Sequence, residues 1–394
     1  MAKLSSSNGK KANVPKLRFP EFTEEWEASN IGEISTYIKG APLSKADISE
    51  TGTPFILYGE LYTTYKEVAT EIKRKTNCIV DKKYFSKIGD VVIPTSGETP
   101  EEIATATCVM TPNVILAGDL NIFRINDIDG RFFSYVINHK VNKDISRIAQ
   151  GKSIVHIKGE EISKIQIKYP SDEEQQKILS FIELLSLKIE KQEQLIDKLK
   201  KYKRGLLQQI FNTNPKYCNS NKCKEKSICD VFSITRGYVL PVSKISPVKT
   251  SEFCYPVYSS QTKDDGLLGY YNEYLFENAI TWTTDGANAG YTRFRKGKFY
   301  CTNVCGVLLN NNGFANEYVA EKINSVSRKY VSYVGNPKLM NNVMAEITIP
   351  FPDVETQKYY SEIIDKINMK LSISHNQCKT LELLKRCLLQ QMFI

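Results

Sequence analysis

The chain has 394 residues, more than one compact core usually serves, so its length predicts two or more domains. Hydrophobic residues make up 41% and charged residues 25%, a soluble globular mixture with no run of about eighteen uncharged apolar residues that would indicate a membrane span. Fifty-three lysines and arginines against 44 aspartates and glutamates give a formal charge of +9, which suits a polyanionic partner. Because the polar start lacks the apolar core of a signal peptide, we expect a cytoplasmic protein.

The first part of the chain predicts a short leader followed by a mixed α+β domain. Residues 1–30 are expected to form a flexible leader and N-terminal segment, and residues 31–170 the first domain. Short β-rich runs lie between turn signals, at Pro54–Tyr58, Asp90–Pro94 and Asn121–Ile125, and the best helical candidate is Gly130–Asn142.

Residues 171–213 predict a long connector helix. Ser171 follows a proline and, with Glu174 three residues later, has the form of a capping box. Ten positions then step by four and three without a break, and eight of them are apolar: Ile178, Ile182, Leu185, Ile189, Gln192, Ile196, Leu199, Lys203, Leu206 and Ile210. This spacing is typical of a heptad seam that packs on another helix.

A linker and a second half of the same plan follow. Residues 214–226 are expected to be a polar linker; Cys218, Cys223 and Cys229 lack the paired spacing and fourth ligand of a zinc site, so we predict free thiols and no metal. Residues 227–352 predict a second mixed α+β domain, with strands at Ala279–Thr283 and Lys298–Leu309 and a helix near Glu317–Val334. Residues 353–394 predict a C-terminal connector helix that Asp353 would cap.

An internal repeat links the two halves. Residues Ile165–Phe211 align without gaps to Ile347–Phe393 at an offset of 182, with fifteen identities among the 47 pairs. The second seam is Tyr360, Ile364, Ile367, Leu371, Ser374, Cys378, Leu381, Lys385, Leu388 and Met392, and its polar exceptions Ser374 and Lys385 match Gln192 and Lys203. A second, weaker sequence repeat at an offset of 197 relates Ile31–Ile34 to Ile228–Val231.

Two apolar seams of equal length, with polar residues at equivalent positions, should pack on each other. The chain order makes this helix pair antiparallel. Each helix of about 40 residues would measure roughly 60 Å, with the two domains related by a pseudo-twofold axis. The alternative is that each helix only covers the core of its own domain. We expect the helix-pair interface to contain Ile182, Leu185, Ile189, Leu199, Leu206, Ile364, Ile367, Leu371, Leu381 and Leu388.

Basic and small polar residues gather in loops of both domains. Lysine and arginine neutralise phosphates, whereas arginine, asparagine, serine and threonine can also contact base edges. The candidate DNA-binding residues are Lys73, Arg74, Lys75, Ser96, Thr99, Lys152, Ser153, Arg236, Asn288, Arg293, Arg295 and Lys338. For any single loop, a plain solvated turn remains the simpler interpretation.

Several segments resemble the specificity subunits of type I restriction–modification systems. They are the opening Leu17–Phe22 with Trp26, the run Pro170–Ile178, and the helix ending Leu199–Phe211 with its second copy. The resemblance covers nearly the whole chain. It implies a non-catalytic subunit that reads a bipartite site on double-stranded DNA with two target-recognition domains. It also implies two methyltransferase subunits bound around the helices, restriction subunits in the full complex, and S-adenosylmethionine, ATP and Mg on those partners rather than on this chain.

The sequence departs from the family pattern in the second half. Gly151–Ile154 precedes the first connector, as is usual in the family, whereas Gly335–Leu339 precedes the second, which itself lacks the Glu-rich start of the first. We find no adenine-methyltransferase motif, phosphate-binding loop or nuclease centre, so we expect no catalytic residues. The alternative from another class is a self-contained DNA-binding regulator or coiled-coil scaffold.

Overall fold

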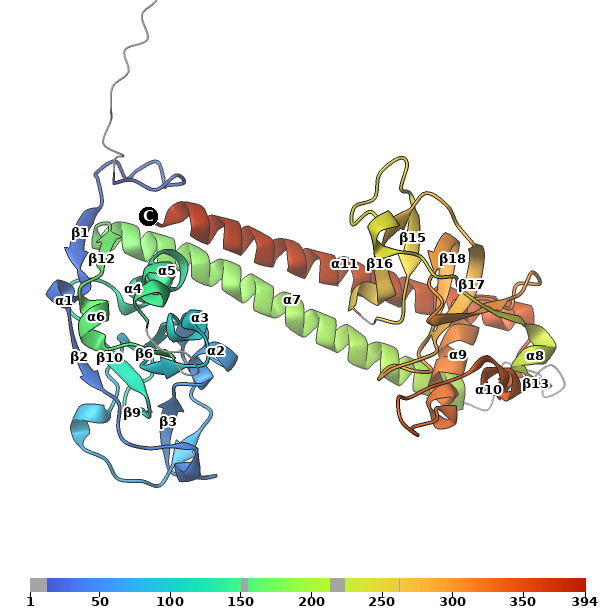
Figure 1. Cartoon of the computed structure of the whole chain (residues 1–394), viewed down its shortest axis with the longest axis horizontal. Coiled ribbons are helices and arrows are strands. Elements are labelled where there is room, and N and C mark those ends of the chain that lie inside the picture. Colours follow the sequence, from blue (N-terminus) through green and yellow to red (C-terminus); the bar gives the residue numbers. More distant parts are fainter. Residues whose placement is uncertain (1–12, 150–154, 213–223, 262) are drawn as a thin grey trace, which may run out of the picture. The chain divides into compact units, whose positions relative to one another are not determined.

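A computed structural model describes residues 13–149, 155–212, 224–261 and 263–394 (Figure 1). The chain divides into two compact units, residues 1–191 with 378–394, and residues 192–377. Unit 1 contains domain 1, which precedes helix α7 (Asp172–Asn212), and unit 2 contains domain 2, which precedes helix α11 (Val354–Met392). Each unit therefore includes part of both connector helices. Among the described helices, none combines the length and the apolarity needed to cross a bilayer.

Domain 1 is built on a five-stranded sheet in the order β2–β10–β6–β8–β4. These strands are β2 (Ser35–Lys39), β4 (Val68–Ala69), β6 (Asp90–Pro94), β8 (Thr107–Val109) and β10 (Leu120–Ile125). A second sheet joins β5 (Lys75–Thr76), β3 (Thr53–Leu57) and β9 (Ile115–Ala117). Other short elements include two 3-10 turns (Lys45–Asp47 and Lys82–Tyr84), α1 (Ile31–Ile34), α2 (Glu60–Thr63), β7 (Ser96–Gly97), α3 (Pro100–Ile103), β11 (Val155–His156) and α6 (Gly159–Ser163). The strands expected at Asp90–Pro94 and Asn121–Ile125 are confirmed.

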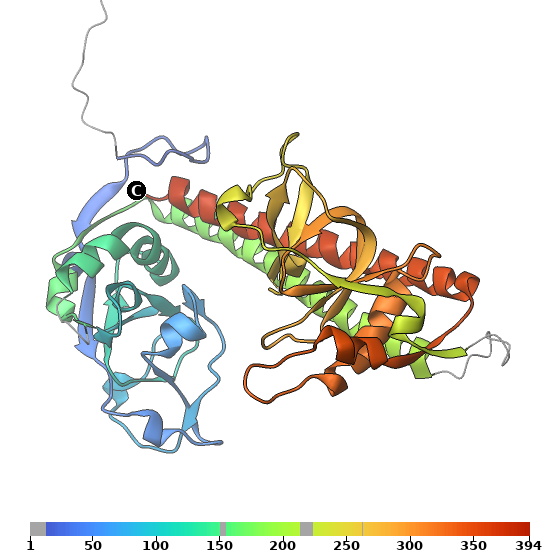
Figure 2. The same cartoon turned by 45° about the vertical axis from the view of Figure 1, so that its right-hand side comes forward.

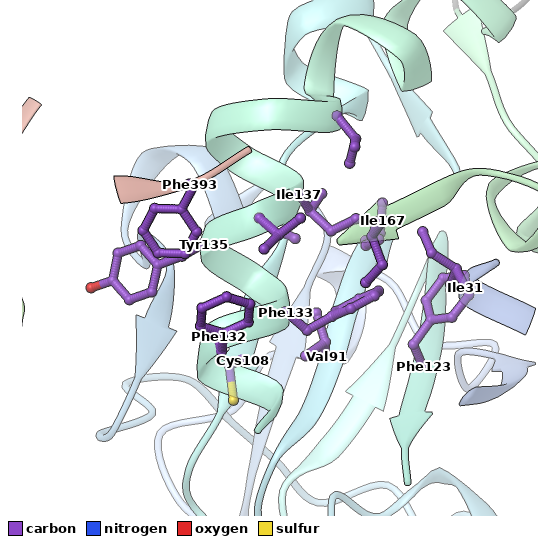
Figure 3. Packing of buried hydrophobic residues seen from close by; sticks show 14 of the residues in the cluster. Ile31, Val91, Cys108, Phe123, Phe132, Phe133, Tyr135, Ile137, Ile167 and Phe393 are labelled. Atoms are coloured by element: carbon purple, nitrogen blue, oxygen red, sulfur yellow. The ribbon is translucent and has the colours of Figure 1, made fainter. Parts of the chain in front are cut away.

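A helical segment covers this sheet and forms the centre of the domain 1 core. It consists of α4 (Gly130–Val136), a π-helical turn (Ile137–Val141) and α5 (Asn142–Ile148), so it runs six residues beyond the expected end at Asn142. Phe132 and Phe133 are fully buried within it. Figure 3 shows these rings together with Phe393, from the end of the chain, whose ring centroid lies 5.2 Å from that of Phe132. Phe393, beyond the end of the second connector, therefore belongs to the core of domain 1.

Domain 2 contains a six-stranded sheet in the order β14–β19–β17–β18–β15–β16. Its strands are β14 (Ser233–Arg236), β15 (Tyr255–Tyr258), β16 (Leu267–Tyr271), β17 (Phe276–Thr283), β18 (Thr292–Cys301) and β19 (Cys305–Leu309). The expectation of one strand over Lys298–Leu309 is wrong. The Cys305 amide donates to the Thr302 carbonyl in a turn, and the two strands flank β17 on opposite sides.

The helix expected near Glu317–Val334 is shorter than predicted. Helix α9 (Glu317–Ser327) ends where the buried Ser327 hydroxyl donates to the Gly290 carbonyl at 2.6 Å, and a 3-10 turn (Arg328–Tyr330) follows. The chain is then held in an extended pairing at Ser332 until α10 (Asn341–Glu346) begins. The expected start at Glu317 is confirmed and the expected end near Val334 is wrong, because these hydrogen bonds compete with further helix.

A glycine permits the packing of the domain 2 core. Trp282 is almost fully buried, and a Cβ atom added at Gly306 would lie 2.1 Å from its indole ring. Any other residue at position 306 would displace either the ring or the strand. The indole Nε1 donates to the Leu339 carbonyl at 3.1 Å, which satisfies its buried polar group.

The two domains share a frame at their junctions with the connectors. In domain 1, β1 (Glu27–Asn30) pairs antiparallel with β12 (Gln166–Tyr169), and in domain 2, β13 (Lys224–Ser227) pairs with β20 (Thr348–Phe351). Each first strand leads into a four-residue helix, α1 or α8 (Ile228–Val231), which opens with a capping box. The weak repeat at an offset of 197 thus corresponds to equivalent structure.

A glutamine at the start of each connector fastens it to its domain. The side-chain amide Nε2 of Gln175 donates to the Pro170 carbonyl at 2.9 Å, and that of Gln357 donates to the Pro352 carbonyl at 2.8 Å. Each side-chain oxygen then accepts from the residue that caps the domain's main helix: from the Asp129 amide before α4, and from the Asn316 side chain before α9. Both glutamines are buried, so these bonds are shielded from water.

The connector helices pack antiparallel in each unit, which confirms that part of the fold prediction. In unit 1, Ile178, Leu179 and Ile182 near the start of α7 share one apolar cluster with Leu389, Met392 and Phe393 near the end of α11. In unit 2, Leu207, Ile210 and Phe211 near the end of α7 share a cluster with Tyr360 and Ile364 near the start of α11. The alternative, in which each helix covers only its own domain, is therefore wrong.

Every seam position is buried or half-buried. Of the expected interface residues, Ile182, Ile364 and Ile367 are buried, and the others are half-buried: Leu185, Ile189, Leu199, Leu206, Leu371, Leu381 and Leu388. The polar exceptions also have partners: the Gln192 amide donates to the Ser374 carbonyl at 3.2 Å, and Lys203 forms an ion pair with Glu321 of α9 at 2.5 Å. Lys385 lies 5.9 Å from the ring centroid of Tyr135.

The described part of the N-terminal segment, residues 13–30, contacts the rest of unit 1. Trp26 is buried, and Arg18 forms a bidentate ion pair with Glu174 at 2.8 and 2.7 Å. The predicted capping box is wrong: Glu174 binds Arg18, and among the described residues no hydrogen bond joins Glu174 to Ser171. In the second connector, Asp353 caps as expected, because its carboxylate accepts from the Thr356 amide at 3.0 Å.

The seam makes a prediction about stability. Changing Ile182 to alanine should lower the free energy of unfolding by about 2–5 kcal/mol, because it leaves a cavity in a fully buried site. Leu184 is 66% exposed on the same helix, so Leu184→Ala should change that free energy by less than about 0.5 kcal/mol. Urea denaturation of the full chain measures both, and equal losses would contradict the buried seam.

Glu317, where α9 meets the connectors, predicts a pH dependence. Burial raises its pKa to about 7, with Glu321 adding to the rise and Lys203 opposing it. A raised carboxyl pKa means that the folded state binds the proton more readily than the unfolded state, so this group's contribution to stability is largest below pH 4.5 and falls as the pH rises through 7. Glu317→Gln should therefore be more stable than the parent at pH 8, on the order of 2–3 kcal/mol, and the gain should shrink toward pH 5.

Denaturation at both pH values, with the exposed Glu355→Gln as the control substitution, measures this dependence. A Glu317→Gln gain that is the same at pH 5 and pH 8 would show that ionisation of Glu317 is not its cause.

Candidate nucleic-acid interface

In domain 1, the loop after β6 is hydrogen-bonded to the segment before the first connector. Strand β7 pairs with β11, Ser96 opposite His156, and the Ile157 amide donates to the Thr95 carbonyl at 3.0 Å. The candidates Lys152 and Ser153 lie outside the described residues, immediately before β11. Two described stretches far apart in the sequence, Thr95–Ser96 and His156–Ile157, are therefore adjacent.

The candidate hydroxyls of this loop are engaged within it. Ser96 is buried, and its hydroxyl donates to the Asp119 carboxylate at 2.8 Å. Thr99 is the N-cap of α3, where its hydroxyl accepts from the Glu102 amide at 3.2 Å. Both side chains hold the loop in shape. The sequence did not predict the contact between Asp119 and Ser96, because nothing in the local pattern links the two residues.

The basic triplet of domain 1 lies beside a cavity of about 700 Å³. Arg74 lines this cavity together with Tyr58, Tyr62 and Asp119, and its Nε donates to the buried Glu60 carboxylate at 2.8 Å. Lys73 and Lys75 alternate with Arg74 and are exposed. The triplet therefore divides into one internally neutralised arginine and two lysines that can meet a phosphate.

Domain 2 repeats the loop arrangement with different residues. The backbones of Asp285 and Lys338 form an antiparallel β-bridge. The Gly286 amide donates to the Pro337 carbonyl at 2.9 Å, and the Leu339 amide donates to the Thr284 carbonyl at 2.9 Å. The half-buried Asn288 lies in this loop, and its carbonyl accepts from the Tyr291 amide at 3.1 Å. Although Gly335–Leu339 departs from the family pattern, it makes the same kind of backbone pairing as the segment around β11.

Two candidate arginines share one face of β18. Arg293 and Arg295 are two residues apart, so their side chains project to the same side of the sheet. The Arg295 guanidinium lies 3.7 Å from the ring centroid of Tyr258, and its Nε donates to the Thr281 hydroxyl at 3.1 Å. Burial lowers the pKa of Arg295, with Tyr258 opposing the shift. Sequence reasoning missed Tyr258, because no local pattern places it over β18.

Arg293 and Arg236 are held by other contacts. Arg293 donates to the Tyr291 hydroxyl at 2.6 Å and forms an ion pair with Asp265, which offsets its charge. Arg236, at the end of β14, donates to the Asn341 side chain at 3.0 Å and so lies close to the start of α10. The candidates of domain 2 thus form two groups, one at the paired loops and one on β18.

One of the three cysteines considered as zinc ligands, Cys229, lies within the described residues. Cys218 and Cys223 lie outside the described residues, and Cys229 is exposed in α8, with its sulfur 3.2 Å from the Ser227 hydroxyl.

The family model for the type I restriction modification DNA specificity domain matches residues 23–201 and 221–383. The chain belongs to this family and carries the domain twice. Membership makes it a sequence-recognition component of such systems, not one of their enzymes.

Relatives from Mycoplasma pneumoniae match segments of the chain. The protein named as the N-terminus of type I specificity subunit S.MpnORF289P is 39% identical over 145 residues, 36% of this chain and 74% of that protein. The type I specificity subunit S.MpnORF285P is 37% identical over 141 residues, 35% of this chain and 45% of that protein. The MpnII type I restriction enzyme specificity subunit is 34% identical over 145 residues, 35% of this chain and 41% of that protein. The match spans less than half the length of the last two relatives.

Two solved structures share the fold. The S subunit of a type I restriction–modification system from M. genitalium superposes with a TM-score of 0.67 at 16% identity, over 97% of this chain and 99% of that chain. A chain from a structural study of complex assembly and conformational transition of the type I R-M system superposes with a TM-score of 0.53 at 14% identity, over 93% and 97%. The prediction of two repeated α+β domains with helical connectors is confirmed.

The Arg295 arrangement predicts an effect on DNA binding. Changing Arg295 to alanine should weaken binding of the domain's target DNA by about ten- to one-hundredfold, because a guanidinium fixed by a ring and a hydroxyl can make an oriented contact. Lys296, the exposed neighbour on β18, provides the control substitution Lys296→Ala. Fluorescence anisotropy with labelled duplex measures both, and equal losses would contradict an oriented contact by Arg295.

Proposed function

We propose that this chain reads a bipartite site on double-stranded DNA, with domain 1 contacting one half and domain 2 the other. The observation that carries the proposal is a backbone pairing that occurs in both domains: Ser96 pairs with His156 in domain 1, and Asp285 pairs with Lys338 in domain 2. The frames at the connectors are alike and the loop residues differ, which is the arrangement expected of two readers with different targets. The candidate DNA-binding residues remain those named from the sequence.

The connectors support a role in setting the spacer between the half-sites. Helix α7 runs unbroken for 41 residues and α11 for 39, so each measures about 60 Å at 1.5 Å per residue. A continuous helix with a packed partner resists bending, and its length is therefore a suitable ruler along a duplex.

We further propose that the outward faces of the connectors dock two adenine methyltransferase subunits, which restriction subunits join in the full complex. Large apolar side chains remain exposed there: Leu184 at 66%, Leu383 at 58%, Tyr202 at 61%, Tyr359 at 62% and Met369 at 60%. Apolar residues that recur along a face exposed to water mark protein-interaction surfaces. S-adenosylmethionine, ATP and Mg would be bound by those partners, in the cytoplasm, and not by this chain.

The experiment is to produce the chain with its genomic methyltransferase partner and to sequence the methylated adenines of the host by single-molecule methods. We expect stable co-purification and one bipartite motif that disappears without this chain. Replacing residues 31–165 with the equivalent segment of another specificity subunit should change one half of the motif only. A replacement that altered both halves would contradict the modular assignment, and a chain that bound DNA but recovered no methyltransferase would favour a self-contained regulator.

A further inference from the structure

A small hairpin stands at the DNA-reading loops of domain 2. Between α9 and α10, the Ser332 amide donates to the Lys338 carbonyl and the Lys338 amide donates to the Ser332 carbonyl, both at 2.9 Å. This pair closes a loop of residues 333–337, the tip loop, in which Gly335 has a positive φ of 75°. A left-handed residue of this kind lets the chain reverse within a few residues. In Figure 2 this orange-red stretch projects from the body of domain 2.

The tip loop presents apolar side chains to water. Val334 is 92% exposed and the adjacent Tyr333 is 69% exposed. Neither side chain contributes to a described apolar core, and two neighbouring apolar residues at the end of a projecting loop form a contact surface with no apolar-core partner among the described residues. Fold stability therefore does not account for their exposure.

The base of the hairpin is rigidly anchored. Leu339 is fully buried, its carbonyl accepts from the Trp282 indole, and its amide donates to Thr284. The Pro337 carbonyl accepts from the amide of Gly286, which lies in the loop after β17. The tip is thus presented from a fixed platform, which limits the entropy lost when it meets a partner.

The hairpin's own segment carries positive charge. Arg328, Lys329 and Lys338 are exposed, and the sequence has no acidic residue from 328 to 345. One acidic residue, Asp285, lies opposite Lys338, and its carboxylate accepts from the Thr284 hydroxyl at 2.7 Å. An apolar tip on a basic base suits a partner with an anionic rim and a partly apolar floor. The DNA major groove has this chemistry, because phosphates border it, thymine methyl groups lie on its floor, and it is wide enough for a two-stranded ribbon.

We propose that this hairpin enters the major groove of the half-site read by domain 2, laying Tyr333 and Val334 against base edges while Lys338 contacts a phosphate. The inference rests on the proposed function, which it deepens by naming the element that reaches the bases. Base contact by the tip makes a contribution that depends on sequence, and the lysine makes one that depends on salt.

The test compares three variants of the full chain in complex with its methyltransferase subunits. The double variant Tyr333→Ser with Val334→Ser should weaken binding to cognate duplex at least tenfold and lower the ratio of cognate to non-cognate affinity by a similar factor. Its slope of log affinity against log salt should not change, because no phosphate contact is removed. Lys338→Ala should instead reduce that slope by about one and leave the ratio unchanged.

The matched control is Tyr238→Ser with Val248→Ser, the same exchanges at domain 2 residues that are 63% and 65% exposed. It should bind as the parent does, and thermal unfolding should show that all variants fold. Cognate affinity and ratio unchanged in the tip variant would overturn the inference, as would loss of methyltransferase co-purification with DNA affinity intact, which would assign the tip to a protein partner. Failure of the parent complex to prefer any sequence would instead overturn the proposed function.

Discussion

The structure depends on the burial of one repeated apolar seam between two helices that run in opposite directions. Gln192 and Ser374 occupy the same position of the repeat, and they contact each other. Such self-pairing is what an antiparallel pair of equivalent helices requires, because a shift of one turn would bring a polar position against an apolar one. The Gln192–Ser374 contact therefore fixes the register of the seam, whereas Lys203 contacts Glu321 of α9 and Lys385 lies beside Tyr135.

This pairing makes each domain depend on the other half of the chain. Phe393, from the end of the second connector, packs on Phe132 and Tyr135 of domain 1. Phe211, from the end of the first connector, packs edge-on against Tyr318 of α9 in domain 2. Since each core contains residues from both connectors, a substitution in either helix can alter the core packing of both units. A domain separated from the distant helix would expose part of its core.

The domains combine a common frame with individual chemistry. The strand pairs at the junctions, the capping boxes and the glutamine clamps at Gln175 and Gln357 occur in both, whereas the loops that carry the candidate residues differ in sequence and in bonding. Several candidate cations are offset within their own domain, as Arg74 is by Glu60 and Arg293 by Asp265. The number of basic candidate residues therefore overstates the cations that are available to a polyanion, and oriented contacts must supply much of the discrimination.

The sequence by itself determined what depends on short periods and on repetition. The heptad steps, the 182-residue repeat, the antiparallel order, the strand at Asp90–Pro94 and the Asp353 cap all follow from neighbours a few residues apart or from a duplicated pattern. Only the tertiary structure decided that Glu174 binds Arg18 instead of capping α7, that the run after Lys298 forms two strands, and that Tyr258 lies over Arg295. Those outcomes are set by hydrogen bonds and ring contacts between distant segments, whose energies outweigh local preference and leave no periodic trace in the chain.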